Sequence, residues 1–233
     1  HLDQPGGFLE YLGKLLAAFY YPKLLGPVLT GLIISGSIYL LSQTGKLISG
    51  KSAYVFPFLT GAAMVYLQAN YQYAAFNNLS IFLQLLAFYL TNRFFHEKWN
   101  WIVVFLFPAW YFLTGGFSWI FLLLFLLQLV VKHEKNWWLK ILIGGALTAM
   151  CFYFGMQFLF FEMPETLLLH PITAMETGMQ VKEFIVLIFL VLMNPPAFRL
   201  KFNMKGRKMN SDLKLGQIAP DIIIVGLALA LIP

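Results

Sequence analysis

Polar side chains that could do chemistry occur in three stretches of this sequence, between long apolar segments. Asp3 and Glu10 are near the amino terminus, amides gather in residues 70–78, and residues 161–180 hold acids and a histidine. A carboxylate can act as a general base toward a hydroxyl group, and nearby polar groups can orient a substrate. We therefore take Asp3 as the candidate catalytic residue. The candidate substrate-binding residues are Glu10, Asn70, Gln72 and Asn77.

The third stretch could hold a divalent cation through Glu162, Glu165 and His170, since carboxylates suit hard cations and imidazole accepts softer ones. The spacing of these residues matches no established metal motif, and a solvated acidic loop is the favoured explanation for them. Plainer roles also exist for the other acids. Asp3 could be a solvated loop carboxylate, and Glu10 could pair with Lys14, four residues further along one helix face.

The segments that separate these polar stretches are long and apolar. The chain is 60% hydrophobic and 11% charged, with a mean hydropathy of +0.74, whereas about 25% charged residues is usual in globular domains. Lipid is the expected solvent, and there helices satisfy their own backbone hydrogen bonds. We predict an all-α, polytopic transmembrane helical bundle over residues 24–233. Its expected spans are 25–42, 53–69, 74–91, 99–113, 116–131, 137–160, 181–197 and 217–233.

Residues 1–23 differ from the bundle that follows them. Pro5-Gly6-Gly7 breaks regular structure, and from Phe8 to Phe19 the apolar residues recur at helical spacing until Pro22. The stretch is short and polar on one side, so we predict an external loop followed by an amphipathic helix in the membrane interface. Because this segment is expected outside without a signal peptide of its own, we also expect at least one membrane helix before His1.

Basic residues alternate from one connection to the next. Lysine and arginine occur after the first, third and fifth expected spans and crowd the loop 198–216, whereas connections 70–77 and 114–116 have none. Short basic loops stay in the cytoplasm. This predicts a multi-pass protein of the cell inner membrane, with the amino-terminal segment and the acidic loop 161–180 outside. The net charge of +6 then reflects orientation and contact with membrane lipids, and we expect no nucleic acid partner.

Several residues within the expected spans predict how the helices pack. Gly31 and Ser35, four residues apart, would let span 25–42 approach a neighbour closely. Thr114-Gly115-Gly116 predicts a tight turn between two antiparallel helices. Amides inside the spans are expected to form hydrogen bonds across helices: Gln84, Gln128 and Gln157.

Two segments carry a resemblance to a known family. The stretch from Gln4 to Pro22 with the small-residue span after it, and the turn from Tyr111 to Gly116, resemble uncharacterised multi-pass membrane proteins of Bacteroidota, a domain of unknown function. The resemblance covers roughly residues 1–130. It implies a first helix upstream and a larger carboxyl-terminal part, and it brings no assigned activity.

The layout of the chain is similar to that of the C-type integral-membrane glycosyltransferases. In those enzymes a first external loop carries a catalytic aspartate and runs into an interfacial helix, which is the placement of Asp3 here. The likeness implies a transferase that uses a lipid-linked sugar donor at the external, periplasmic face. The sequence departs from that pattern because no second acid stands beside Asp3, and a shared layout does not by itself imply a shared function.

We therefore expect a glycosyltransferase-like membrane enzyme, with Asp3 as general base and a divalent cation to offset the donor phosphate charge. The alternative is a non-enzymatic anchor or scaffold subunit of an envelope complex, with other envelope proteins as partners. A transporter is the third candidate. It is disfavoured because the spans hold few central charges and show no internal repeat.

Overall fold

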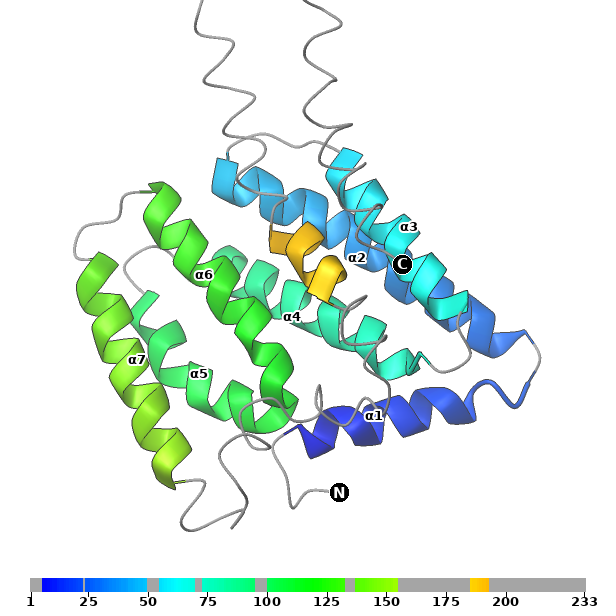
Figure 1. Cartoon of the computed structure of the whole chain (residues 1–233), viewed down its shortest axis with the longest axis horizontal. Helices are drawn as coiled ribbons and strands as arrows, with labels where there is room; N and C mark the ends of the chain where they lie inside the picture. The colour runs from blue at the N-terminus through cyan, green and yellow to red at the C-terminus, as the bar shows by residue number, and fades with distance from the viewer. Residues whose placement is uncertain are drawn as a thin grey trace, which may run out of the picture.

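The computed structural model describes residues 6–22, 24–49, 55–69, 73–94, 100–132, 137–154 and 185–192. Within these ranges the chain is helical and contains no strand, which confirms the all-α prediction. The helices are α1 Gly7–Ala18, α2 Leu25–Ser49, α3 Val55–Ala69, α4 Ala75–Phe94, α5 Asn100–Thr114, α6 Ser118–Lys132 and α7 Trp137–Phe154, with a 3₁₀ turn η2 at Gly115–Phe117 and a further helical stretch at 185–192 (Figure 1).

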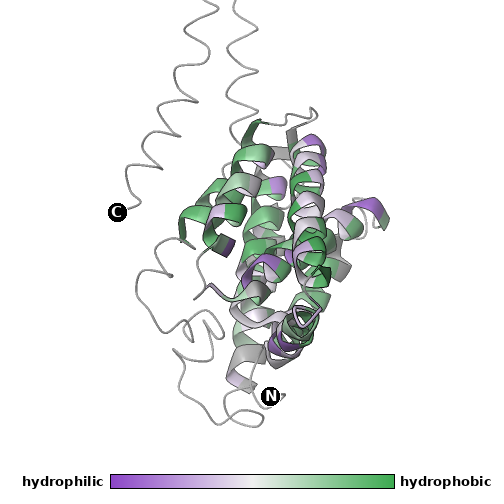
Figure 2. Ribbon diagram, turned by 90° about the vertical axis from the view of Figure 1, so that its right-hand side faces the viewer, coloured by the Kyte–Doolittle hydropathy of each residue, from purple (hydrophilic) through white to green (hydrophobic). Residues whose placement is uncertain are grey.

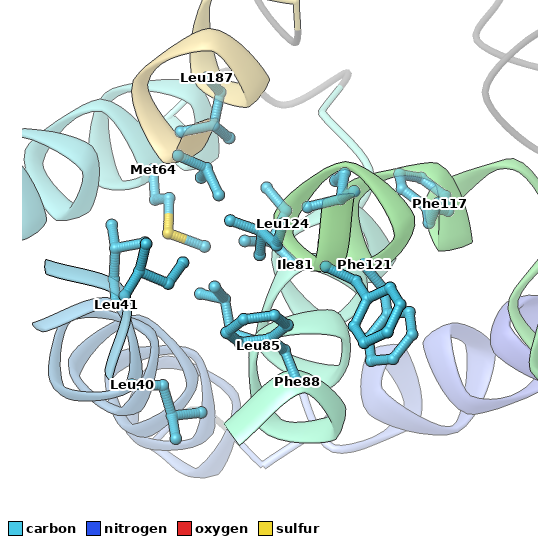
Figure 3. Packing of buried hydrophobic residues seen from close by; sticks show 14 of the residues in the cluster. Leu40, Leu41, Met64, Ile81, Leu85, Phe88, Phe117, Phe121, Leu124 and Leu187 are labelled. Atoms are coloured by element: carbon cyan, nitrogen blue, oxygen red, sulfur yellow. The ribbon is translucent and has the colours of Figure 1, made fainter. Parts of the chain in front are cut away.

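Helix α4 lies at the centre of the bundle, where it packs on α2, α1 and α6. Ile81, Leu85 and Phe88 on α4 are completely buried and meet side chains from the surrounding helices. Figure 3 shows these residues between Leu41 of α2 and Leu124 of α6. The core therefore forms around one face of α4 and extends to its neighbours on both sides.

The predicted turn between α5 and α6 is confirmed. Gly115 has a φ of 62°, a left-handed conformation that glycine adopts without the steric cost of a Cβ atom. The chain then reverses, and the rings of Phe107 and Phe121 stack with centroids 6.4 Å apart. Tyr111 and Trp119, closer to the turn, are 6.5 Å apart. Each ring pair joins a residue of α5, before Gly115, to a residue of α6, after it. Helices α5 and α6 therefore lie side by side and form a helical hairpin.

The prediction that Gly31 and Ser35 mediate close packing is wrong. Among the described residues, a Cβ atom added at Gly31 would meet nothing within 4 Å, and Ser35 is exposed, with its hydroxyl donating to the Gly31 carbonyl. The close approach lies on another face of α2. A Cβ atom at Gly36 would come within 2.7 Å of the Phe82 ring on α4. The neighbouring helices pack against that face and leave the Gly31 face open.

Two stretches of the described helices are long and apolar enough to cross a membrane, Leu25–Ile48 and Val103–Leu129, and Val55–Ala69 is a shorter apolar helix. Within the described residues the expected eight spans are therefore not matched by eight such helices, and the expected span 217–233 lies outside these residues. Helices α3, α5 and α6 have 15 residues each, about 22 Å at 1.5 Å per residue, against a hydrocarbon core of about 30 Å. Val103–Leu129 also contains the turn at Gly115, so it is two helices rather than one straight span. Length and composition alone make weak evidence, because a buried helix of a water-soluble protein meets both criteria.

The connected helices run alternately in opposite directions. Helix α1, the start of α4 and the α5–α6 turn lie together at one end, whereas the ends of α2, α4 and α6 lie toward the upper left in Figure 1. Among the described residues, the basic ones other than Lys14 all belong to that second end: Lys46, Arg93, Lys132 and Lys140. Charge is therefore separated along the bundle.

Candidate functional site

Helix α1 crosses the ends of α4 and α5 instead of running beside them for their whole length (Figure 1). Its first contact is a hydrogen bond in which the Gly6 backbone N–H donates to the Phe112 carbonyl, 3.1 Å away. Its second is at Gly13, where an added Cβ atom would lie 2.5 Å from the Phe76 Cβ atom on α4. The absence of a side chain at Gly13 therefore lets the two backbones approach. We call this region, formed by α1, the start of α4 and the turn η2, the α1 end.

Two of the predicted site residues lie at the α1 end. Glu10 is one helical turn before Gly13, and Asn77 directly follows Phe76, which Gly13 contacts. Within the described ranges Glu10 is the only acidic residue, and its side chain is partly exposed. The structure thus brings two of the predicted residues to the same end. Asp3, Asn70 and Gln72 lie outside the described residues.

Asn77 is a buried amide at the α1 end. It is 1% exposed, and neither its side-chain oxygen nor its nitrogen has a hydrogen-bond partner among the described residues. Ser118 is fully buried, and within the same ranges its hydroxyl has no partner either. The residues just before them in sequence, Phe76 and Phe117, pack edge to face with centroids 6.1 Å apart. Leaving such groups unpaired costs about 1–3 kcal/mol each, so this is an energetically expensive place for polar side chains.

The neighbouring amide, Asn78, has partners on both sides. Its Nδ2 donates to Gln68 Oε1 at 2.9 Å, and Tyr73 donates its hydroxyl to Asn78 Oδ1 at 3.1 Å. These bonds connect the end of α3 to the start of α4. Asn78 therefore has the structural role that the plainer interpretation of stretch 70–78 assigns to polar residues at helix ends.

Two of the amides predicted to bond across helices do so, Gln84 on α4 and Gln128 on α6. Trp110 on α5 donates its indole N–H to Gln84 Oε1 at 2.7 Å. Gln128 on α6 donates to Asn92 Oδ1 at 2.5 Å. The expected interhelical role is confirmed for Gln84 and Gln128, whereas Gln157 lies outside the described residues.

Comparison with known proteins places the chain in a family. The model of a family of unknown function, DUF6057, matches residues 1–224 of the 233-residue chain. The chain belongs to this family. The expected resemblance to an uncharacterised family is confirmed in this respect, and the match extends well past residue 130. No curated protein and no solved structure matches the chain.

The candidate metal ligands of the DUF6057 chain, Glu162, Glu165 and His170, lie outside the described residues. Within the described ranges no group of three or more His, Cys, Asp and Glu side chains could hold a metal ion. What the described part offers chemically at the α1 end is therefore one partly exposed carboxylate, Glu10, with the amide of Asn77 and the hydroxyl of Ser118 buried at the same end. Of these groups, only Glu10 is accessible to a polar ligand.

Sequence reasoning missed one feature of this DUF6057 chain, an apolar pocket of about 370 Å³ between α5, α6 and α7. The signal for it is on α7, where small residues occupy neighbouring turns: Gly144, Gly145, Thr148 and Ala149. On the opposite wall the residues are bulky, Phe107, Phe121 and Phe125 among them. The sequence shows both sets, but only their facing placement creates the space.

Proposed function

We propose that this chain is a multi-pass inner-membrane protein. The observation that supports this best is an exposed apolar face along α2, made of Val28, Leu32 and Tyr39, which are 59%, 62% and 60% exposed. Similar apolar faces occur on α5 and α7, and Figure 2 shows apolar residues along much of the helical bundle. Water-soluble monomers rarely expose apolar patches of this extent, whereas lipid covers them at no cost.

The proposed orientation follows from the charge separation. The end that carries Lys46 and Arg93 would be cytoplasmic, because short basic loops stay inside. The α1 end would then face the periplasm. Helix α2, with 25 residues, is about 37 Å long and can cross alone. The shorter helices of the eight-span arrangement would cross where the bilayer thins around the bundle, which costs fractions of a kcal/mol per Å of mismatch.

At the α1 end we propose transfer of a sugar from a lipid-linked donor to an acceptor hydroxyl. Asp3 would take the hydroxyl proton as the oxygen attacks the anomeric carbon, and the bond from that carbon to the donor phosphate would break, so that the lipid phosphate leaves with the electron pair. Glu10, with Asn70 and Gln72, would contact the substrate, whereas Asn77, the fourth predicted substrate-binding residue, is 1% exposed and would act only from behind them. A divalent cation on Glu162, Glu165 and His170 would offset the phosphate charge. The position of Glu10 and Asn77 at one end supports this arrangement.

The experiment is sugar transfer by full-length protein in membranes, using radiolabelled donor from a lipid extract. Asp3→Asn keeps the shape of the side chain and removes its basicity, so we expect turnover to fall by about 10²–10⁴. Lys46→Gln, a single charge change at the opposite end of the bundle, serves as the control and should keep full turnover. Full turnover by Asp3→Asn would remove Asp3 from the mechanism.

A non-enzymatic scaffold is the second candidate, and the outer face of α1 favours it. Phe8, Tyr11, Leu15 and Phe19 are all exposed and follow one another at helical spacing. A helix of another envelope protein could cover this stripe. The scaffold would be supported by a stoichiometric partner that co-purifies with wild-type protein and is lost from the double variant Tyr11→Ser, Leu15→Ser. Purification without any partner would argue against it.

A further inference from the structure

The pocket between α5, α6 and α7 exists because α7 packs mainly on α5 and contacts α6 little. From α5 and α6 its walls are apolar and aromatic, with Val104, Phe107, Phe121 and Phe125 among them. The wall that α7 contributes consists of small residues. The volume of about 370 Å³ falls in the range of small-ligand sites, about 300–1,000 Å³.

Two adjacent glycines on α7 differ in a way that locates the open part of the pocket. A Cβ atom at Gly144 would lie 3.3 Å from Val104 Cγ1, so Gly144 is at the contact between α7 and α5. A Cβ atom at Gly145 would meet nothing within 4 Å, although Gly145 lines the pocket. The space in front of Gly145 can therefore accept additional atoms without moving any of the helices.

We propose that this pocket binds the hydrocarbon chain of a membrane lipid. The proposal rests on the membrane placement proposed above and does not depend on sugar transfer. Among the described residues no charged side chain lines the pocket, and the Thr148 hydroxyl already donates to the Gly144 carbonyl at 2.7 Å. Away from Tyr111 and Trp119, a polar ligand would lose its hydrogen bonds to water there without replacement, at a cost of several kcal/mol by transfer scales. A hydrocarbon chain loses none.

The surroundings of the pocket also favour a lipid. Its α5 and α6 walls belong to the apolar stretch Val103–Leu129, which folds into the α5–α6 hairpin. The helices that form it also carry exposed apolar side chains, Phe105 on α5 and Leu142 and Met150 on α7. In a bilayer these residues would contact hydrocarbon, so the pocket would be continuous with the lipid phase and an acyl chain could enter from the side.

The two ends of the pocket suggest how the lipid is oriented. Tyr111 and Trp119 line it next to the α5–α6 turn, at the α1 end, whereas Val103 and Leu129 line it toward the other end. Tryptophan combines an apolar ring with a polar N–H and settles at the level of lipid headgroups; Trp119 is partly exposed, whereas Tyr111 is buried. The acyl chain of the lipid would therefore lie along the α5–α6 hairpin, and the lipid headgroup would lie at the α1 end, near Gly6 and Phe112.

Photo-crosslinking can test this. Full-length protein is reconstituted in phosphatidylethanolamine and phosphatidylglycerol vesicles that contain a phospholipid with a diazirine on its acyl chain. After illumination, mass spectrometry measures labelling of the α5, α6 and α7 peptides. Gly145→Phe fills the pocket and should lower labelling of the pocket-lining residues at least fivefold. Gly31→Phe, the same change at an equally open position on the outside of α2, should leave it unchanged.

Folding and membrane insertion are checked separately by melting temperature and by extraction of the membrane fraction with carbonate. Gly145→Leu, which fills less space, serves if Gly145→Phe fails to fold. Undiminished pocket labelling in a folded Gly145 variant would overturn the proposal, as would wild-type labelling spread evenly over α2 and α7, which would mean that another segment or copy of the chain fills the pocket. Release of the protein by carbonate would refute the membrane placement itself.

Discussion

Gly13 is the residue at which α1 and α4 come closest, because an added Cβ atom would lie 2.5 Å from Phe76 Cβ. Phe76 Cβ is fixed to its backbone and cannot rotate away. We expect Gly13→Ala to lower the free energy of unfolding by about 1–3 kcal/mol through overpacking, which exceeds the gain of about 1 kcal/mol in helix propensity. Thermal unfolding in detergent measures it. Gly31→Ala, which meets nothing, should be neutral or stabilising, and equal effects of the two changes would contradict the packing.

A second residue-scale prediction concerns the bond between Trp110 and Gln84. Trp110→Phe removes the indole donor and leaves Gln84 Oε1 without that partner in a buried site, so it should destabilise by about 1–3 kcal/mol. Adding Gln84→Leu removes the stranded amide, so the double variant should lose less than the sum of the single variants. For membrane helices the coupling is typically about 0.6 kcal/mol. A double-mutant cycle with zero coupling would show that the two side chains act independently.

At the scale of elements, the α5–α6 turn depends on the left-handed conformation of Gly115. A side chain with a Cβ atom costs about 1–2 kcal/mol in that conformation, and asparagine tolerates it better than most residues. Gly115→Leu should therefore be less stable than Gly115→Asn by about 1 kcal/mol, although the two side chains are similar in size. Denaturant midpoints compare them. Equal midpoints would mean that the hairpin does not need this conformation.

At the scale of the whole molecule, the proposed orientation can be tested with single cysteines in a Cys151→Ala background. Tyr11 is 56% exposed at the α1 end, and Phe94 is 72% exposed at the basic end. An impermeant thiol reagent should label Tyr11→Cys in intact cells and Phe94→Cys only after permeabilisation, because the basic end is expected inside. The reverse pattern of labelling would mean that the topology is inverted, and equal labelling of both positions would contradict the proposed orientation.

The sequence alone determined the local structure. Apolar periodicity and breakers predicted the helix that begins near Gly7, Thr114-Gly115-Gly116 predicted the hairpin turn, and the amides of Gln84 and Gln128 predicted bonds between helices. These features depend on neighbours in the chain, or on the high cost of leaving a polar group unpaired in an apolar setting. The helix, the turn and the need of each amide for a partner are therefore encoded within a few residues, whereas the partners themselves, Trp110 and Asn92, are not.

The tertiary structure alone decided which face of each helix meets a neighbour. Gly31 and Gly36 are both glycines of one helix, and only Gly36 contacts Phe82, because α4 lies on that side. Asn77 belongs to a polar stretch that the sequence places at a helix end, yet it is buried. The pocket at Gly145 likewise needs the bulky wall of α5 and α6 opposite α7. Contacts between residues far apart in sequence depend on how whole helices dock, and local spacing does not contain that information.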